Sequence, residues 1–172
     1  MVGYSLLHIA QFPSFKELQL WQNLGIYCLL NVSGINMYDI YDAISLAPFD
    51  IEQIPLVDFF TSQPNMDAIS HAQLFNSYLY CQHACEQQQQ ALLAAVDFLS
   101  HQLTYQVPTT IFCHRGLGRS PLVVAAALQR FYGESPAQAI ARTRAVQPHA
   151  LFSEVSLSAL HWCASQGRSH AL

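Results

Sequence analysis

Apolar residues recur with helical spacing through much of the chain. Leu18, Trp21 and Leu24 follow one another about a turn apart, behind a capping-box start formed by Ser14 and Glu17. The same kind of pattern predicts further helices at 68–103, 135–147 and 153–163. The first of these segments is long enough to hold two helices.

One more helix is predicted from Leu122 to Tyr132, and it differs from the others because it is apolar on every side. Pro121 suits its first turn, and Gly133 suits its C-terminal end. A helix without a polar face is buried in a globular protein. We therefore expect this helix at the centre of the molecule.

Short apolar or β-branched runs between the helices predict strands at 26–32, 54–57 and 109–112. Strands that alternate with helices are typical of an α/β domain, in which helices cover both faces of a sheet. No linker rich in proline, glycine or serine divides the chain. The sequence therefore predicts a single domain over residues 1–172.

Composition excludes several classes of protein. Hydrophobic residues make up 52% of the chain and charged residues only 10%, which is too apolar for a disordered protein. No continuous apolar run is long enough to cross a bilayer, and a net charge of -4 without a basic tract offers no stripe to nucleic acid or anionic lipid. We expect neither a nucleic-acid nor a membrane partner, and the sequence does not determine the oligomeric state.

Cysteine usage indicates a reducing compartment. The chain has 5 cysteines at irregular spacing, and its start lacks the features of a signal peptide. Free thiols in the cytoplasm are therefore predicted. Cys28, on a predicted strand, is interpreted as a buried structural cysteine, and a protective disulfide with Cys113 is the alternative.

The strongest chemical signal follows the predicted strand at 109–112. The chain there runs into the apolar helix through Cys113-His114-Arg115-Gly116-Leu117-Gly118-Arg119-Ser120. A loop between a strand end and a helix N-terminus points backbone N–H groups into one concavity, where the helix dipole favours an anion. Gly116 and Gly118 permit the backbone angles of such a cradle, and the planar guanidinium of Arg119 can bind two phosphate oxygens at once.

Cys113 is expected at the bottom of this positive well, which favours the thiolate, the nucleophilic form of cysteine. Ser120 can donate a hydrogen bond to that thiolate and help it leave. The loop from His114 to Gly118 would hold the substrate's phosphate. The side chains of His114 and Arg115 either face the rim or are simply exposed to solvent. This chemistry requires no metal and no organic cofactor.

The run from Cys113 to Pro121 resembles the signature loop of the protein tyrosine phosphatase superfamily, and its Arg-Ser-Pro ending is most similar to the dual-specificity branch. The segments 24–33 and 139–148 are similar to that family's first helix-to-strand unit and penultimate helix. The resemblance implies a central, mostly parallel sheet of about four to five strands flanked by helices. One position departs from the family, because Phe112 stands where a histidine that orders the loop is usual.

The resemblance also implies a general acid, carried by an aspartate on a loop before the cysteine. The segment from Ile54 to Phe60 is similar to the one that carries this acid, so Asp58 is the predicted acid. The spacing from Asp58 to Cys113 is longer than in compact members of the family, which predicts an insertion at about 61–86. Asp67, inside that insertion, is the alternative acid.

The function predicted from these residues is hydrolysis of a phosphate monoester through a phosphocysteine intermediate. The substrate would be a phosphoprotein or a small phosphate ester. One alternative is a weak or inactive phosphate-binding module. Another is a different thiol enzyme with an anion loop, such as a sulfurtransferase or an arsenate reductase. The two glycines and the Arg119-Ser120 ending favour the phosphatase over these thiol enzymes.

Overall fold

A computed structural model describes residues 6–56 and 86–167 of the chain. Within them lies a 4-stranded parallel sheet in the order β1-β4-β2-β3. The strands are β1 (Leu7–Gln11), β2 (Cys28–Asn31), β3 (Asp50–Gln53) and β4 (Thr109–Cys113). The prediction of an α/β fold with a parallel sheet is confirmed.

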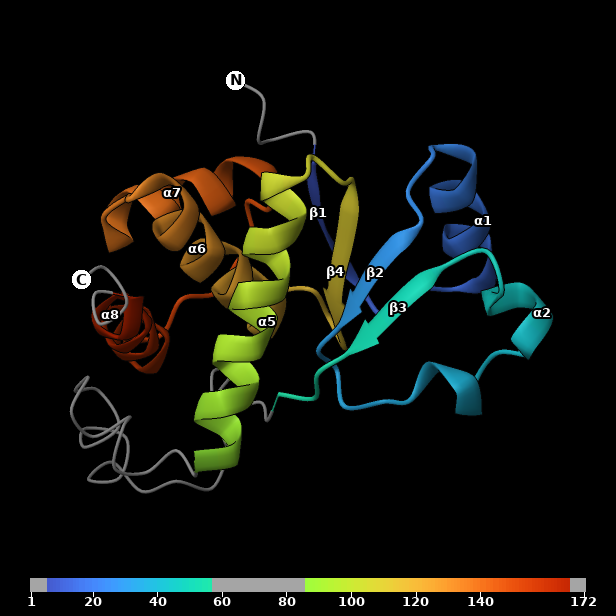
Figure 1. Cartoon of the computed structure of the whole chain (residues 1–172), viewed down its shortest axis with the longest axis horizontal. Helices are drawn as coiled ribbons and strands as arrows, with labels where there is room; N and C mark the ends of the chain where they lie inside the picture. The colour runs from blue at the N-terminus through green and yellow to red at the C-terminus, as the bar shows by residue number, and fades with distance from the viewer. Residues whose placement is uncertain (1–5, 57–85, 168–172) are drawn as a thin grey trace.

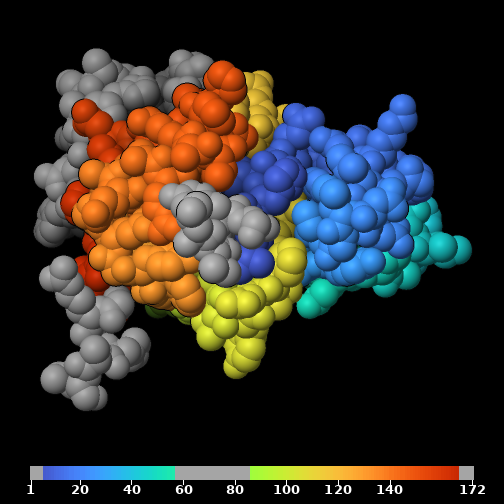
Figure 2. All heavy atoms as spheres, turned by 90° about the horizontal axis from the view of Figure 1, so that it is seen from above, coloured from blue at the N-terminus to red at the C-terminus, as the bar shows by residue number. Residues whose placement is uncertain are grey.

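Helices cover both faces of this sheet (Figure 1). The helices are α1 (Phe15–Asn23), α2 (Ala43–Leu46), α5 (Glu86–Thr104), α6 (Arg119–Tyr132), α7 (Pro136–Val146) and α8 (Glu154–Gly167), with a short 3-10 helix η1 (Met37–Asp39). One face carries α1, and the other carries α5 to α8. Figure 2 shows the molecule from above. The blue-to-cyan segments from α1 to β3 lie on one side, and the orange helices α6 and α7 lie on the other.

The sheet divides the core into two clusters, and neighbouring residues of β4 point into different ones. Ile111 belongs to the larger cluster, which α5, α6 and α8 share, whereas Phe112 belongs to the smaller cluster beside α1. All residues from Arg119 to Gln129 of α6 are buried. The expectation of a central buried helix is therefore confirmed, and its N-terminus is fixed where the loop after β4 ends.

Most predicted helix boundaries agree with the structure, although α6 begins three residues earlier and α8 ends four residues later than predicted. Ser14 caps α1 in a complete capping box with Glu17, and Gly133 ends α6 in the left-handed conformation with φ 68°. Of the helix predicted at 68–103, the described part is α5, whose apolar residues are buried against α6. The part before Glu86 lies outside the described residues. Among the described helices, none has both the length and the apolarity that a membrane span requires.

Two strands differ from the sequence prediction. The strand predicted at 54–57 is wrong. The third strand in chain order is β3, which begins four residues earlier and consists mostly of polar residues. Ile54 N and Leu56 N still donate to Asn31 O (2.9 Å) and Val32 O (3.3 Å), but Pro55 between them has no N–H to donate. The edge strand β1 was not predicted at all, since its short and partly exposed sequence lacks a strong apolar pattern.

Candidate active site

The loop with the strongest chemical signal lies at the carboxyl edge of the parallel sheet. Cys113 is the last residue of β4, and Arg119 is the first residue of α6. In open α/β sheets this edge is where ligands bind. Cys113 is 2% exposed and Arg119 is 8% exposed, while His114 and Arg115 between them are exposed. The fold thus places a thiol and a guanidinium at the two ends of one short loop.

The loop is oriented by hydrogen bonds to its carbonyl groups. These bonds run from Phe12 N to His114 O (3.3 Å), from Gln147 Nε2 to Gly116 O (3.3 Å) and from Leu151 N to Leu117 O (2.7 Å). By contrast, no backbone N–H of residues 114–118 donates a hydrogen bond to another described residue. Because several of its carbonyl oxygens bond to surrounding segments and its backbone N–H groups bond to none of them, the loop is suited to bind an anion.

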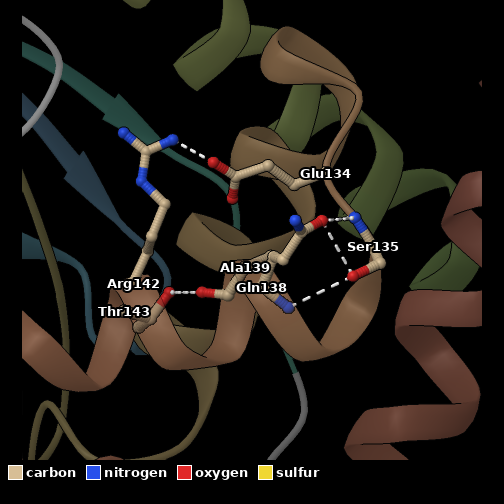
Figure 3. Close-up of polar contacts among 6 residues, drawn as sticks. All are labelled: Glu134, Ser135, Gln138, Ala139, Arg142 and Thr143. Atoms are coloured by element: carbon tan, nitrogen blue, oxygen red, sulfur yellow. Dashed lines mark hydrogen bonds and ion pairs between the residues drawn. The ribbon is translucent and has the colours of Figure 1, made fainter.

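Helix α7 supplies one of these supports. Its start is fixed by a capping box, in which Ser135 Oγ accepts from Gln138 N (3.3 Å) and Gln138 Oε1 accepts from Ser135 N (2.9 Å) (Figure 3). Arg142 of the same helix forms an ion pair with Glu134 (Figure 3). Gln147 caps the other end of α7, so the contact of its side chain with the loop rests on a well-anchored helix.

Gly116 is the position where the loop depends most on glycine. Its φ is +68°, in the left-handed region, and a Cβ added there would lie 2.6 Å from Ala10 O and 2.9 Å from Gln11 N. Both atoms belong to the backbone of β1, which cannot move aside without disturbing the sheet. The edge strand that the sequence pattern missed therefore determines how closely the loop packs.

We expect Gly116→Ala to lower both the free energy of unfolding and the rate of phosphate ester hydrolysis. The left-handed conformation costs ~1–2 kcal/mol for a residue with a Cβ, and the contact with β1 adds to that cost. A loop displaced by ~1 Å can lose about 10²-fold in activity. Gly133→Ala is the matched control, because Gly133 also has φ +68° but nothing within 4 Å of the added Cβ. Denaturant unfolding and aryl phosphate turnover should show a larger loss for Gly116→Ala on both measures, and equal losses would contradict the role of the β1 contact.

Arg119 is held by three backbone carbonyl groups from other parts of the chain. Its Nη1 donates to Ser33 O (2.8 Å), Leu56 O (3.0 Å) and Val32 O (3.4 Å). Two of these acceptors follow β2, and the third lies beyond β3. All three contacts are made by one nitrogen, so they anchor that end of the guanidinium, a rigid fork of donors, to the backbone that follows β2 and β3.

Ser120 is completely buried next to Arg119, at the start of α6. Its Oγ has no hydrogen-bond partner within the described part of the chain. Buried hydroxyl groups are normally paired, because an unpaired one costs ~1–3 kcal/mol. The hydrogen bond from Ser120 to the Cys113 sulfur that the sequence predicts is therefore not formed in this structure.

A disulfide between Cys28 and Cys113 is excluded by the register of the sheet. Cys28 pairs with Thr109 at the beginning of β4, whereas Cys113 is the last residue of that strand. The two positions are ~13 Å apart along the strand, well beyond the ~7 Å Cα separation that a disulfide can bridge. Both thiols are reduced, and burial raises the pKa of the Cys28 thiol. Cys28 is therefore a structural residue, as the sequence indicated.

Phe112, which departs from the family pattern, is fully buried on the α1 face of the sheet. Its ring packs edge-on against Phe12 at 5.6 Å and lies 6.0 Å from Trp21. Such aromatic packing anchors the end of β4 without a hydrogen bond from the side chain. Sequence reasoning identified the substitution but not the aromatic partners that surround it.

The predicted acid is not part of the described structure. Asp58, the alternative Asp67 and the predicted insertion up to residue 85 all lie outside the described residues. Leu56, the last described residue before them, is 4% exposed and contacts Arg119 through its carbonyl oxygen. The roles of both aspartates therefore remain predictions.

Comparison with known proteins gives a fold but no close relative. No family model and no curated protein matches the sequence. Among solved structures, PTPMT1 matches with a TM-score of 0.67 at 13% identity, covering 99% of this chain and 96% of that one. Tk-PTP in its active form matches with a TM-score of 0.65 at 16% identity, covering 93% and 92%. Human DUSP28 matches with a TM-score of 0.65 at 16% identity, covering 97% and 96%.

These neighbours are protein tyrosine and dual-specificity phosphatases. The described part of the chain therefore has the fold of that class, as the resemblance of the loop implied. At such low identity the likeness establishes the architecture. The chemistry has to be argued from the residues of the site itself.

Proposed function

We propose that this protein is a cysteine-dependent phosphatase that hydrolyses phosphate monoesters through a phosphocysteine intermediate. The observation that carries the proposal is the loop between Cys113 and Arg119: the carbonyls of His114, Gly116 and Leu117 accept hydrogen bonds from surrounding segments, while no backbone N–H of residues 114–118 donates to a described residue. The fold shared with tyrosine and dual-specificity phosphatases supports the same conclusion.

In the first step, the thiolate of Cys113 attacks phosphorus, an S–P bond forms, and the bond from phosphorus to the leaving oxygen breaks. The loop amides and Arg119 bind the phosphoryl oxygens, which carry the negative charge through the transition state. Asp58 gives its proton to the leaving oxygen, so that an alcohol or phenol departs.

In the second step, water attacks the phosphocysteine, and Asp58, now ionised, accepts the water's proton. The S–P bond breaks, inorganic phosphate is formed, and the electron pair returns to the sulfur of Cys113. The buried hydroxyl of Ser120 is the group we assign to donate a hydrogen bond to this departing thiolate. In this structure the Ser120 hydroxyl makes no hydrogen bond to Cys113 or to any other described residue, so the proposed role requires the hydroxyl to turn toward the sulfur during the reaction.

The position of Leu56 supports Asp58 as the acid. Its carbonyl oxygen accepts a hydrogen bond from Arg119 Nη1 at 3.0 Å, and Asp58 is two positions further along the chain. Asp67 is eleven positions from Leu56, so the separation in the sequence favours Asp58 as the proposed acid.

The proposed substrates are phosphoproteins or small phosphate esters. One structure of PTPMT1, which shares this fold, is a complex with PI(5)P. Exposed His114 and Arg115 would contact the part of the substrate beyond the phosphate. Turnover of an aryl phosphate, a phosphotyrosyl peptide and a phosphoinositide, followed by phosphate release, distinguishes these classes.

Asp58→Asn is expected to lower kcat by ~10²–10⁴ on an alkyl phosphate, because the leaving alkoxide then departs without a proton. The loss should be much smaller on an aryl phosphate whose phenol is a good leaving group. Asp67→Asn is the matched control and should change neither rate substantially.

If the two aspartates exchange these effects, Asp67 is the acid and the assignment of Asp58 is wrong. If neither substitution changes turnover of the alkyl phosphate, no aspartate of this segment protonates the leaving group. Both outcomes leave the nucleophile to be tested separately at Cys113.

A further inference from the structure

Asn31 is a buried polar residue at the end of β2, close to the proposed site but outside the loop. It is 2% exposed, and its side chain uses its full hydrogen-bonding capacity. Nδ2 donates to Ile35 O (2.7 Å) and Gln53 Oε1 (2.9 Å), and Oδ1 accepts from Ser33 N (2.9 Å) and Ser33 Oγ (2.7 Å). Few other side chains could replace it, because this position requires two donors and two acceptors in one small planar group.

These contacts build the turn that follows β2. Ser33 Oγ donates to Asn31 and accepts from Ile35 N (3.0 Å), so the hydroxyl closes the turn from its other side. Gln53, at the end of β3, accepts from Met37 N (2.9 Å) as well as from Asn31, and thereby ties the turn to the neighbouring strand. Ser33 and Ile35 are consequently held by side-chain hydrogen bonds, while Val32 before them still bonds to β4 through its backbone.

This turn presents the shortest of the carbonyl contacts that hold the phosphate clamp. Ser33 O accepts from Arg119 Nη1 at 2.8 Å, and the preceding carbonyl, Val32 O, accepts from the same nitrogen at 3.4 Å. The direction of the Ser33 carbonyl depends on the turn that Asn31 holds, whereas Val32 is also held by its own backbone hydrogen bonds to Phe112 and Leu56. A change at Asn31 should therefore reach the guanidinium through a single residue, Ser33.

We infer that Asn31 is a positioning residue for Arg119: it orients the turn at Ser33, which in turn orients the guanidinium toward bound phosphate. This inference rests on the proposed function, since it assigns the clamp role to Arg119. It adds to the site a residue that contacts neither substrate nor loop and that acts only through the clamp.

The test is Asn31→Ala, measured by the affinity for tungstate, a phosphate mimic, and by kcat/KM on an aryl phosphate. Both quantities should fall ~10- to 100-fold, because misplacing a binding group by ~1 Å can cost about 10²-fold. Ser33→Ala is the milder second variant, which keeps the carbonyl but removes the hydroxyl of the turn. It should lower the same two quantities by a smaller factor, and it serves as the test if Asn31→Ala does not fold.

Two controls separate positioning from a general loss of stability. Leu103→Ala removes a buried side chain (3% exposed) near the opposite end of the sheet, where α5 leads to β4, and should reduce stability while leaving tungstate affinity unchanged. Asn36→Ala alters an exposed asparagine of the same connection, whose Oδ1 accepts from Tyr38 N and Gln53 Nε2 and which makes no hydrogen bond to Ser33. It should leave both quantities close to those of the unchanged protein.

A double-mutant cycle then identifies the route of the effect. With Arg119→Lys already in place, Asn31→Ala should cause little further loss of tungstate affinity, because the planar fork that it orients is gone. Equal losses in both backgrounds, or an unchanged affinity in Asn31→Ala, would overturn the inference. If the unchanged protein binds tungstate but turns over no phosphate ester, the proposed function fails while the cycle on tungstate affinity still decides the role of Asn31.

Discussion

Cys113→Ser is expected to abolish phosphate ester hydrolysis while leaving the affinity for tungstate within a few-fold of the unchanged protein. A serine hydroxyl is not ionised at neutral pH and cannot replace the thiolate as nucleophile. The loop amides, their outward-bound carbonyls and Arg119 are all unchanged by this substitution, so the anion cradle persists. The expected loss of kcat is at least ~10⁴-fold, comparable to removal of the nucleophile in other covalent mechanisms.

Cys28→Ser is the matched control for this experiment. Cys28 is also a buried, reduced cysteine on a central strand, but it lies at the opposite end of the sheet. It should retain turnover. Parallel loss of tungstate binding and turnover in Cys113→Ser would mean that Cys113 supports the loop structurally instead of attacking phosphorus.

Arg119→Lys is expected to be nearly as damaging as Arg119→Ala, with losses of ~10²–10³ in kcat/KM for either variant. Lysine keeps the positive charge but loses the planar fork that binds two phosphate oxygens together. It also cannot reproduce the geometry by which Nη1 joins Ser33, Leu56 and Val32. Affinity for tungstate should fall along with turnover, because the clamp binds the anion in the ground state as well.

Arg130→Lys serves as the control, since Arg130 lies in the last turn of the same helix and pairs with Asp97 instead of facing the loop. Its turnover should match that of the unchanged protein. If Arg119→Lys retained most activity, charge alone would suffice at this position, and the clamp role that we assign to the guanidinium would be wrong.

The sequence was most informative where local chemistry determines the structure. The Cys113 to Arg119 loop, the buried helix α6 and the capping boxes at Ser14 and Ser135 each follow from neighbouring residues, and the structure has them where they were predicted. In these segments the side chains that specify the backbone lie within a few positions of it.

The sequence was least informative where the structure depends on distant partners. β1 and β3 are short edge strands with partly exposed residues, and only pairing with β4 and β2 makes them strands. The carbonyls that hold Arg119 belong to segments far away in the chain, as does the β1 backbone against which Gly116 packs. No local pattern encodes such contacts, so the supports of the site became visible only in three dimensions.

Asn31 illustrates the same limit for function. In the sequence, Asn31 is a single polar residue near the end of an apolar run, and this pattern indicates nothing more than the end of a strand. Its significance comes from Gln53 on a neighbouring strand and from Arg119 on a helix much later in the chain. Residues that act through another residue are therefore harder to find in a sequence than the residues that touch the substrate.

The most direct test of the central claim is to trap the covalent intermediate. The protein is mixed with a radiolabelled phosphate ester, quenched in acid within the first turnover, digested and mapped. We predict label on the peptide that contains Cys113, as a phosphocysteine that forms and decays at rates consistent with kcat, and no label in Cys113→Ser. Turnover without any label on that peptide, or label on a different residue, would contradict a mechanism that passes through phosphocysteine.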